Sequence, residues 1–305
     1  MLDFIIKRFL QVIVVVFLAL TVVFFLIRLA GDPTTLFLPP DAPREQIEEY
    51  RELLGYNRPL YVQYGDFVSS AVQGDFGESL RSQEDALGIV LSRLPATFQL
   101  AISALVLALL IAIPLGVLSA YKRNTVFDRI GVGLTVVGQA VPSFWLGLLL
   151  IFFFAAQLKV LPSGGGGTPV HMILPTLTLA AYSVARFTRF TRSAMLDVLR
   201  KDYIRTAKAS GVPTMRLIMR YALRNSLIPI ITLVALDLGV LLGGAVITEV
   251  VFSWPGVGRL LMQSLMNRDF PIVLAGVFII ALIYAIINFV ADILYAYVNP
   301  QIRVK

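Results

Sequence analysis

The chain has 305 residues, of which 57% are apolar, and its formal net charge is +7. A soluble domain is usually about 45 to 50% apolar, so this composition predicts a membrane protein. The sequence holds no cysteine and a single histidine, His171, which excludes a disulfide framework and a Cys/His metal cage. The basic residues lie between apolar runs, which favours lipid headgroups and cytoplasmic partners over nucleic acid.

Six apolar runs are candidates for crossing a hydrocarbon core about 30 Å thick, which requires roughly 20 residues per helix. We expect these spans at 9–30, 97–120, 131–157, 171–190, 227–248 and 271–291. The apolar part of the fourth run is short, but its helix can extend into the basic residues that follow. The first run is longer than the roughly 7 to 15 apolar residues of a signal peptide, so we favour a membrane anchor over a cleaved signal. The sequence predicts an all-α integral membrane protein with one transmembrane domain over residues 1–305.

The distribution of basic residues predicts the orientation of the spans. With a cytoplasmic amino terminus, the inner segments carry 17 lysines and arginines, and the two short outer segments carry three. The long outer segment is left out because long loops cross the membrane largely regardless of their charge. Positive residues are enriched on the cytoplasmic side, so we expect both termini in the cytoplasm.

The first outer segment, 31–96, is acidic, with eleven Asp and Glu against five Arg. It contains two helix-like patterns, because proline is tolerated in a first helical turn and glycine commonly ends a helix. The first runs from Asp41 and Pro43 to Gly55, and the second runs from Pro59 to Gly74. We favour a solvated cap over the first span, with a landing surface for an external partner as the alternative.

The next outer loop contains four consecutive glycines, 164–167. A phosphate-binding loop would need a preceding strand and a following Lys-Ser or Lys-Thr pair, and the sequence has neither. We therefore expect these glycines to form a flexible loop.

Intramembrane enzyme chemistry is not indicated by the polar residues of the spans. Asp237 and Glu249 lie twelve residues apart, which is roughly 18 Å along one helix and too far for a catalytic dyad. A carboxylate in the middle of a span is costly unless it faces the bundle interior or a hydrated path. Asp237 can therefore line a path or make a buried structural contact, and Gln139 is favoured as an interhelical hydrogen-bond former. The three residues considered for pathway lining are Gln139, Asp237 and Glu249.

Residues 186–226 carry ten lysines and arginines against two acids, between two apolar runs. Gly211 and Pro213 predict the end of one short helix and the start of another, with Asp202 as the cap of the first. Helical spacing places three residues of that helix on one side, namely Ile204, Ala207 and Lys208. Spacing alone favours a loop on lipid headgroups over a docking surface for a soluble partner.

The segment DYIRTAKASGVPTMRLIMRYALRNSLIP, 202–229, resembles the loop that defines permease subunits of binding-protein-dependent ABC importers, in the dipeptide, oligopeptide and nickel branch. The resemblance covers nearly the whole chain. Further stretches similar to that branch follow in order, namely IKRFLQVIVVVFLALTVVFFLIRLAGDP (6–33), RPLYVQY (58–64), GDFGESL (74–80), VPSFWLGLLL (141–150), LGGAVITEVVFSWPGVGRLL (242–261) and RDFPIV (268–273).

The importer motif reads EAA, three residues, Gly, nine residues, then I-x-L-P, and Ala207, Gly211 and Leu223 keep this pattern. Arg205 stands where the motif has glutamate and Arg224 where it has proline, so the resemblance assigns no role to these two arginines. It implies a cytoplasmic coupling helix between the fourth and fifth spans that docks into an ATPase. The residues expected to couple are Ile204, Ala207, Lys208, Gly211, Val212 and Pro213.

The resemblance implies a permease that forms half of a path for short peptides or a related solute in the cytoplasmic, or inner, membrane. Its expected partners are a second permease, two ATPases that bind ATP and Mg²⁺, and an external solute-binding protein. No cofactor or metal is expected on this chain. Its longest polar segment, 66 residues, is also too short for a nucleotide-binding domain of about 100 residues. The alternative is an ion- or proton-coupled carrier that works through Asp237 without an ATPase.

Overall fold

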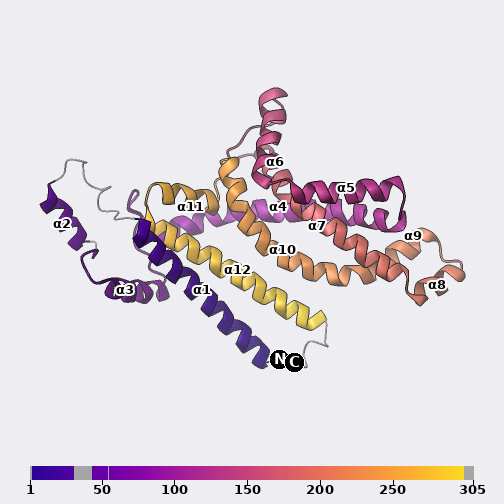
Figure 1. Cartoon of the computed structure of the whole chain (residues 1–305), viewed down its shortest axis with the longest axis horizontal. Coiled ribbons are helices and arrows are strands. Elements are labelled where there is room, and N and C mark those ends of the chain that lie inside the picture. Colours follow the sequence, from indigo (N-terminus) through magenta and orange to yellow (C-terminus); the bar gives the residue numbers. More distant parts are fainter. Residues whose placement is uncertain (1, 31–42, 54, 299–305) are drawn as a thin grey trace. The chain divides into compact units, whose positions relative to one another are not determined.

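The computed structural model describes residues 2–30, 43–53 and 55–298, and this part of the chain is helical without a named strand. Figure 1 shows the order of the helices along the chain. The elements are α1 (Leu2–Ala30), α2 (Arg44–Leu53), α3 (Leu60–Val72), α4 (Ala86–Tyr121), α5 (Val126–Ala140), α6 (Ser143–Leu150), the π-helical η2 (Ile151–Gln157), the 3-10 turn η3 (Pro169–Met172), α7 (Ile173–Leu199), α8 (Asp202–Ala209), α9 (Thr214–Arg216), the π-helical η4 (Leu217–Leu223), α10 (Arg224–Val251), α11 (Val257–Met266) and α12 (Phe270–Val298).

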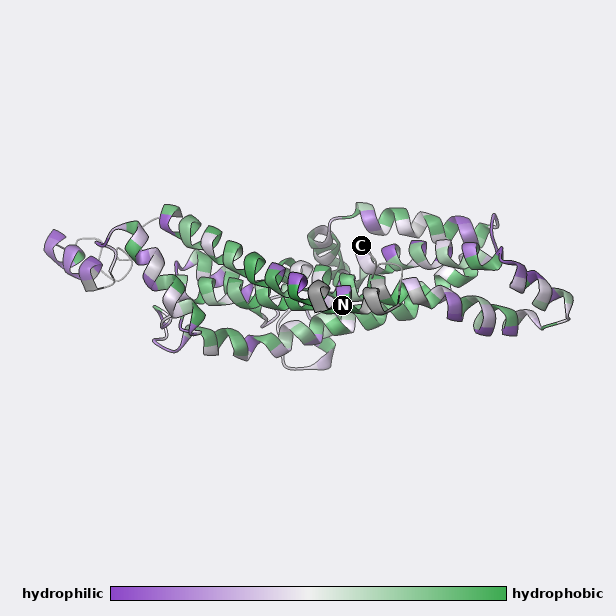
Figure 2. Cartoon of the chain, turned by 90° about the horizontal axis from the view of Figure 1, so that it is seen from below, coloured by the Kyte–Doolittle hydropathy of each residue, from purple (hydrophilic) through white to green (hydrophobic). Residues whose placement is uncertain are grey.

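These helices divide into two compact units, which we describe separately. One unit contains Ala96–Gly258 and the chain from Ile286 onward, and the other contains Leu2–Pro95 and Arg259–Ala285. A single domain over 1–305 stays a prediction. Figure 2 shows hydrophobic residues along the long helices, whereas hydrophilic residues gather on α2 and around α8 and α9.

Within the described residues, five helices are long and apolar enough to cross a membrane, namely α1, α4, α7 with η3, α10 and α12. The third predicted span, 131–157, is not one continuous helix, because α5 and the α6–η2 helix meet at an angle of 102°. With this bent pair counted as one broken span, the described residues contain six candidate spans, as predicted. Val141 at the break has extended backbone angles, φ −80° and ψ 122°. Proline disfavours the helical conformation in the preceding residue and lacks an N–H, so Pro142 accounts for the break.

The unit of Leu2–Pro95 and Arg259–Ala285 confirms the two helices predicted after the first span. Helix α2 begins directly after Pro43, and Pro59 is the residue before α3. Gly55 and Gly74 follow these helices with φ of +71° and +80°, values that favour glycine. Asp41, expected at the first helix start, lies outside the described residues. The second span begins at Ala86, well before the predicted residue 97, so the connecting segment is shorter than expected.

The unit of Ala96–Gly258 packs closely because α4 presents small residues inward. Four alanines of α4 at helical spacing are completely buried, namely Ala101, Ala104, Ala108 and Ala112. Small side chains let helix backbones approach closely in membranes, where apolar side chains gain little from leaving lipid. Helices α5, α6, α7 and α10 pack together in the same unit.

The basic segment 186–226 is mostly helical. Helix α7 continues to Leu199, so the predicted extension of the fourth span is confirmed and runs beyond residue 190. The predicted helix, turn and helix is also confirmed, with α8 before Gly211 and α9 after Pro213. The predicted cap is wrong: Lys201 is the N-cap residue, without a side-chain cap hydrogen bond. Asp202 is instead the first helical residue.

Candidate transport path and coupling surface

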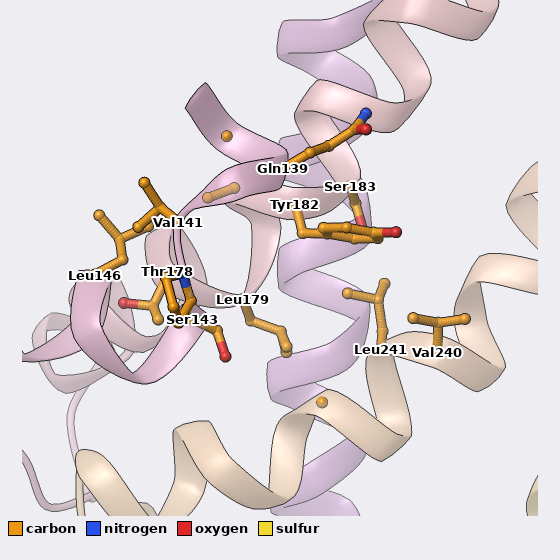
Figure 3. Close-up of a pocket in the computed structure, with 14 residues that line it drawn as sticks. Gln139, Val141, Ser143, Leu146, Thr178, Leu179, Tyr182, Ser183, Val240 and Leu241 are labelled. Atoms are coloured by element: carbon orange, nitrogen blue, oxygen red, sulfur yellow. The ribbon is translucent and has the colours of Figure 1, made fainter. Parts of the chain in front are cut away.

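A cavity of about 300 Å³ is lined by residues of α5, α6, α7 and α10, next to the break between α5 and α6. Figure 3 shows Gln139, Ser143 and Tyr182 among the residues around this cavity, with Leu241 of α10. None of the described lining residues is charged, and hydroxyl and amide groups supply the polarity. The bend at Pro142 prevents α5 and α6 from forming one straight helix, which contributes to the gap between these helices.

Gln139 does not make the interhelical hydrogen bond that we expected of it. Its side-chain Nε2 is buried and has no hydrogen-bond partner among the described residues. A buried amide N–H without a partner costs roughly 1–3 kcal/mol. An acceptor that reaches this N–H would form a hydrogen bond with it and remove that cost. Gln139 therefore brings an unused hydrogen-bond donor to the lining of the cavity.

Asp237 is completely buried on α10 and is held by two residues of α7. Ser183 donates a hydrogen bond of 2.5 Å to Oδ2, and Arg186 donates one of 2.8 Å to Oδ1. Since Arg186 and Asp237 neutralise each other, the carboxylate brings no unbalanced charge into the span. Asp237 is not among the described lining residues, but Ser183 is. Of the two roles left open by the sequence, the geometry favours the buried structural contact beside the cavity.

Glu249 is also completely buried, at a different place near the end of α10. Thr97 donates a hydrogen bond of 2.7 Å to its Oε1, and the same hydroxyl accepts one of 2.9 Å from the backbone N–H of Val257. Gly256 lies so close to the carboxylate that a Cβ there would overlap it. Glu249 is not among the described residues of the cavity lining. Through Thr97, it ties the segment after α10 to α4.

The four-glycine loop is packed, in contrast to the expected flexible loop. A Cβ on Gly164 would overlap the carbonyl group of Phe252, and the N–H of Gly165 donates a hydrogen bond of 2.8 Å to that carbonyl oxygen. Gly165 and Gly167 have φ of +102° and +101°, which disfavour any residue with a Cβ. The close approach of the Phe252 backbone and the positive φ angles explain why this loop contains glycines.

The six residues predicted to couple, which lie between Ile204 and Pro213, divide into an inner and an outer set. Ile204 is buried, and Ala207 and Val212 pack against the same apolar cluster of the chain itself. The outer set is exposed and consists of Lys208, Gly211 and Pro213. Among Ile204, Ala207 and Lys208, which were expected on one side of the helix, only Lys208 is exposed.

Two backbone hydrogen bonds fix the turn after α8. The N–H of Val212 donates to the carbonyl of Ala207 at 3.1 Å, and that of Gly211 donates to Lys208 at 3.1 Å. This is the Schellman pattern of helix ends, which needs a left-handed residue, and Gly211 supplies it with φ +77°. A Cβ built on Gly211 would meet no atom within 4 Å, so the surface beside the turn is open.

Arg205 and Arg224, to which the sequence assigned no role, are both exposed. Arg205 lies 3.7 Å from Asp202 across one helical turn, and these two side chains are 77% and 96% exposed. An ion pair in this position contributes little to stability.

The arginines that pair with buried acids were not predicted from the sequence. Residues 97–258 contain five acids, and two of these, Asp128 and Asp237, bind Arg192 and Arg186 of α7. The small number of acids in this part of the chain could have indicated such pairs, because a buried carboxylate requires a cation or several hydrogen-bond donors. The sequence did not indicate which arginine meets which acid.

Comparison with known proteins identifies the family. The model described as "Binding-protein-dependent transport system inner membrane component" matches residues 112–304, and the N-terminal model of the same transport systems matches residues 1–101. The chain belongs to the permease family of binding-protein-dependent ABC importers. The glutathione transport system permease protein GsiC of Escherichia coli K12 is 42% identical over 100% of both chains. GsiC of Shigella flexneri serotype 5b is 41% identical over the same full lengths.

Solved structures show the same fold. The inward-facing MetNI methionine ABC transporter matches 69% of this permease and 96% of its own chain, with a TM-score of 0.55 at 16% identity. An amino acid ABC transporter crystallised with histidines matches 69% of the permease and 92% of its own chain, with a TM-score of 0.52 at 18% identity. At these identities the structures are used for the fold alone.

The permease is thus a multi-pass membrane subunit of an ABC importer and not an enzyme, as the sequence predicted. Importers of this kind combine a permease of this type with a partner permease, ATPase subunits and a binding protein. The ATPase of such an importer is a separate subunit. The bacterial permeases of this family lie in the inner membrane.

Proposed function

We propose that this permease forms half of a translocation path for short peptides, with glutathione-like tripeptides as the first solutes to test. The observation that carries this proposal is the full-length similarity of 42% to permeases named for glutathione transport. The cavity supports it, because its described lining offers amide and hydroxyl groups without a charged side chain. An amide such as that of Gln139 both donates and accepts, which complements a peptide bond.

The solute is tested with the purified importer, containing both permeases, both ATPases and the binding protein, in proteoliposomes. We expect ATP-dependent uptake of labelled glutathione or dipeptides. Uptake of a nickel chelate alone would contradict the peptide proposal. Uptake by this chain without ATPases would instead favour the ion-coupled carrier.

The subunit is placed with both termini in the cytoplasm, and its two partner ATPases bind the ATP and Mg²⁺. The excess of basic residues in the segments assigned to the inside supports this orientation. The chain contains no cysteine, so a single introduced cysteine reports its own location. We expect Ser82→Cys to react with an impermeant maleimide in intact cells and Ser210→Cys to react only after the membrane is opened, since both serines are exposed. The reverse pattern would refute the orientation.

The exposed residues Lys208, Gly211 and Pro213 form the surface that docks into an ATPase, while Ile204, Ala207 and Val212 hold this surface on the membrane domain. Gly211→Trp places a large side chain on that surface and forces a left-handed backbone that bulky residues disfavour. We expect solute-stimulated ATP hydrolysis and transport to be lost while the chain is still inserted. Gly211→Asn is the matched control, because asparagine tolerates this backbone and is small. Normal transport by a correctly assembled Gly211→Trp importer would contradict the proposed ATPase-docking surface.

A further inference from the structure

Asp128, in the first turn of α5, is bound by three other parts of the chain. Arg192 of α7 donates to both carboxylate oxygens, from Nε at 2.7 Å and from Nη2 at 2.9 Å. Ser119 of α4 donates to Oδ1 at 2.9 Å, and the backbone N–H of Asn124 donates to Oδ2 at 2.9 Å. The side chain of Asp128 is 6% exposed and that of Arg192 is 25% exposed. We name Asp128, Arg192 and Ser119 the clamp.

The clamp holds the beginning of α5, and the end of the same helix borders the cavity. Helix α5 runs from Val126 to Ala140, and Gly138 and Gln139 in its last turn line the cavity. A helix of this length transmits a displacement of one end to the other, because its backbone hydrogen bonds keep it rigid. Movement of the clamped end therefore reaches the wall of the cavity.

The helix ends that carry the clamp also carry the coupling segment. Val117 and Ala120 of α4 flank Ser119 and belong to the apolar cluster that buries Ile204 of α8. Met195 of α7, three residues after Arg192, is completely buried in this cluster. A displacement of α8 is therefore passed to the ends of α4 and α7.

Helices α4 and α7 contact each other tightly in the same region. A Cβ on Gly116 would lie 2.6 Å from Cβ of Thr191 and 2.9 Å from the carbonyl oxygen of Thr188, distances that real Cβ atoms do not adopt. Close-packed interiors resist deformation, so this contact keeps the two helices together when either is displaced. The cytoplasmic ends of α4 and α7 with α8 and η4 form the coupling block.

We propose that Asp128 and Arg192 are positioning residues that make α5 move with the coupling block, so that displacement of α8 by an ATPase opens or closes the cavity. This inference rests on the proposed function, since it requires an ATPase that acts on α8. A planar guanidinium bound through two nitrogens fixes orientation as well as distance. A buried ion pair is often no more stabilising than apolar residues of similar volume. The contribution that we assign to this pair is therefore to fix the position of α5 relative to α7.

The proposal is tested with Asp128→Asn, Arg192→Gln and the double variant, each in the complete importer. We measure solute-stimulated ATP hydrolysis and uptake per assembled complex. We expect hydrolysis to stay within about twofold of the unchanged importer and uptake per ATP to fall at least about fivefold, the lower end of usual coupling between sites. The double variant is expected to match the single ones, because both residues act through one contact.

Two further variants control this experiment. Arg129→Gln removes an exposed charge from the same turn of α5 and is expected to leave uptake per ATP unchanged. Arg192→Lys keeps the charge but cannot bind through two nitrogens, and it provides a milder variant if the neutral ones fail to assemble. We expect it to fall between the unchanged importer and Arg192→Gln.

A distance measurement separates positioning from a purely structural role. Spin labels on Val136→Cys of α5 and Ser210→Cys beside α8 report whether these parts move together, and both positions are exposed. We expect one narrow distance with and without ATP in the unchanged background, and a broader, ATP-dependent distribution with Asp128→Asn.

Unchanged uptake per ATP in all clamp variants would overturn the proposal. A parallel loss of hydrolysis, uptake and assembled complex, with an unchanged distance distribution, would overturn it as well and leave a structural ion pair. If the importer without substitutions shows no ATP-dependent uptake of any peptide, the proposed function fails first, independently of the clamp.

Discussion

The buried pair of Asp237 and Arg186 gives the sharpest test of how this permease tolerates a carboxylate inside a span. Asp237→Leu removes the carboxylate and leaves Arg186 without its partner. Breaking a buried pair in this way costs about 3–5 kcal/mol in soluble proteins. The side chain of Arg186 is 28% exposed, so its charge is only partly buried within this chain and we expect a loss near the lower end, about 3 kcal/mol.

Companion variants divide this loss among its causes. Replacing both partners, with Asp237→Leu and Arg186→Met, removes both charges, and we expect stability within about 1 kcal/mol of the unchanged permease. Ser183→Ala removes one hydrogen bond to an ionised acceptor and is expected to cost about 2 kcal/mol. The double variant should therefore be more stable than Asp237→Leu alone, although it carries more substitutions.

Thermal unfolding of the purified importer in nanodiscs measures these differences, and uptake is measured in parallel. Unfolding of Asp237→Leu at the temperature of the unchanged permease would contradict a stabilising role of the buried pair, and so would a double variant that is the least stable of the three. An Asp237→Asn variant that keeps its stability but loses uptake driven by a proton gradient would favour the carrier mechanism.

Two further substitutions test the packing near the end of α10. Gly164→Ala is expected to destabilise the permease by about 1–3 kcal/mol, because its Cβ would overlap the backbone of Phe252. Thermal unfolding measures this loss. The control is Gly243→Ala, whose Cβ would meet no atom within 4 Å. Equal stability of these two variants would contradict the close-approach explanation of the glycine loop. Thr97→Val removes one donor to the buried Glu249 carboxylate and the acceptor of the Val257 N–H, and it is expected to lower the unfolding free energy by about 1–3 kcal/mol, whereas Thr97→Ser should be nearly neutral.

The sequence predicted the long helices well because membrane spans require long apolar runs with all backbone hydrogen bonds inside the helix. The turn at Gly211 was also predictable, since few residues other than glycine adopt its left-handed backbone before a proline. The break at Val141 was not predicted, although Pro142 was visible, because the apolar run continues without a charge through both helices. Proline can kink a membrane helix or end it, and the surrounding helices decide between these outcomes.

The sequence by itself determined that this chain is a membrane permease with a basic segment between its fourth and fifth predicted spans, because hydropathy, charge asymmetry and the importer motif are local properties. Only the tertiary structure decided which side of each helix is buried and which side chains meet. It turned Ile204 inward and left Lys208 outside, and it paired Asp237 with Arg186 and Asp128 with Arg192. Such pairings depend on which helices lie side by side. The sequence of a membrane helix says little about which helices pack against it, because all sides of the helix are similarly apolar.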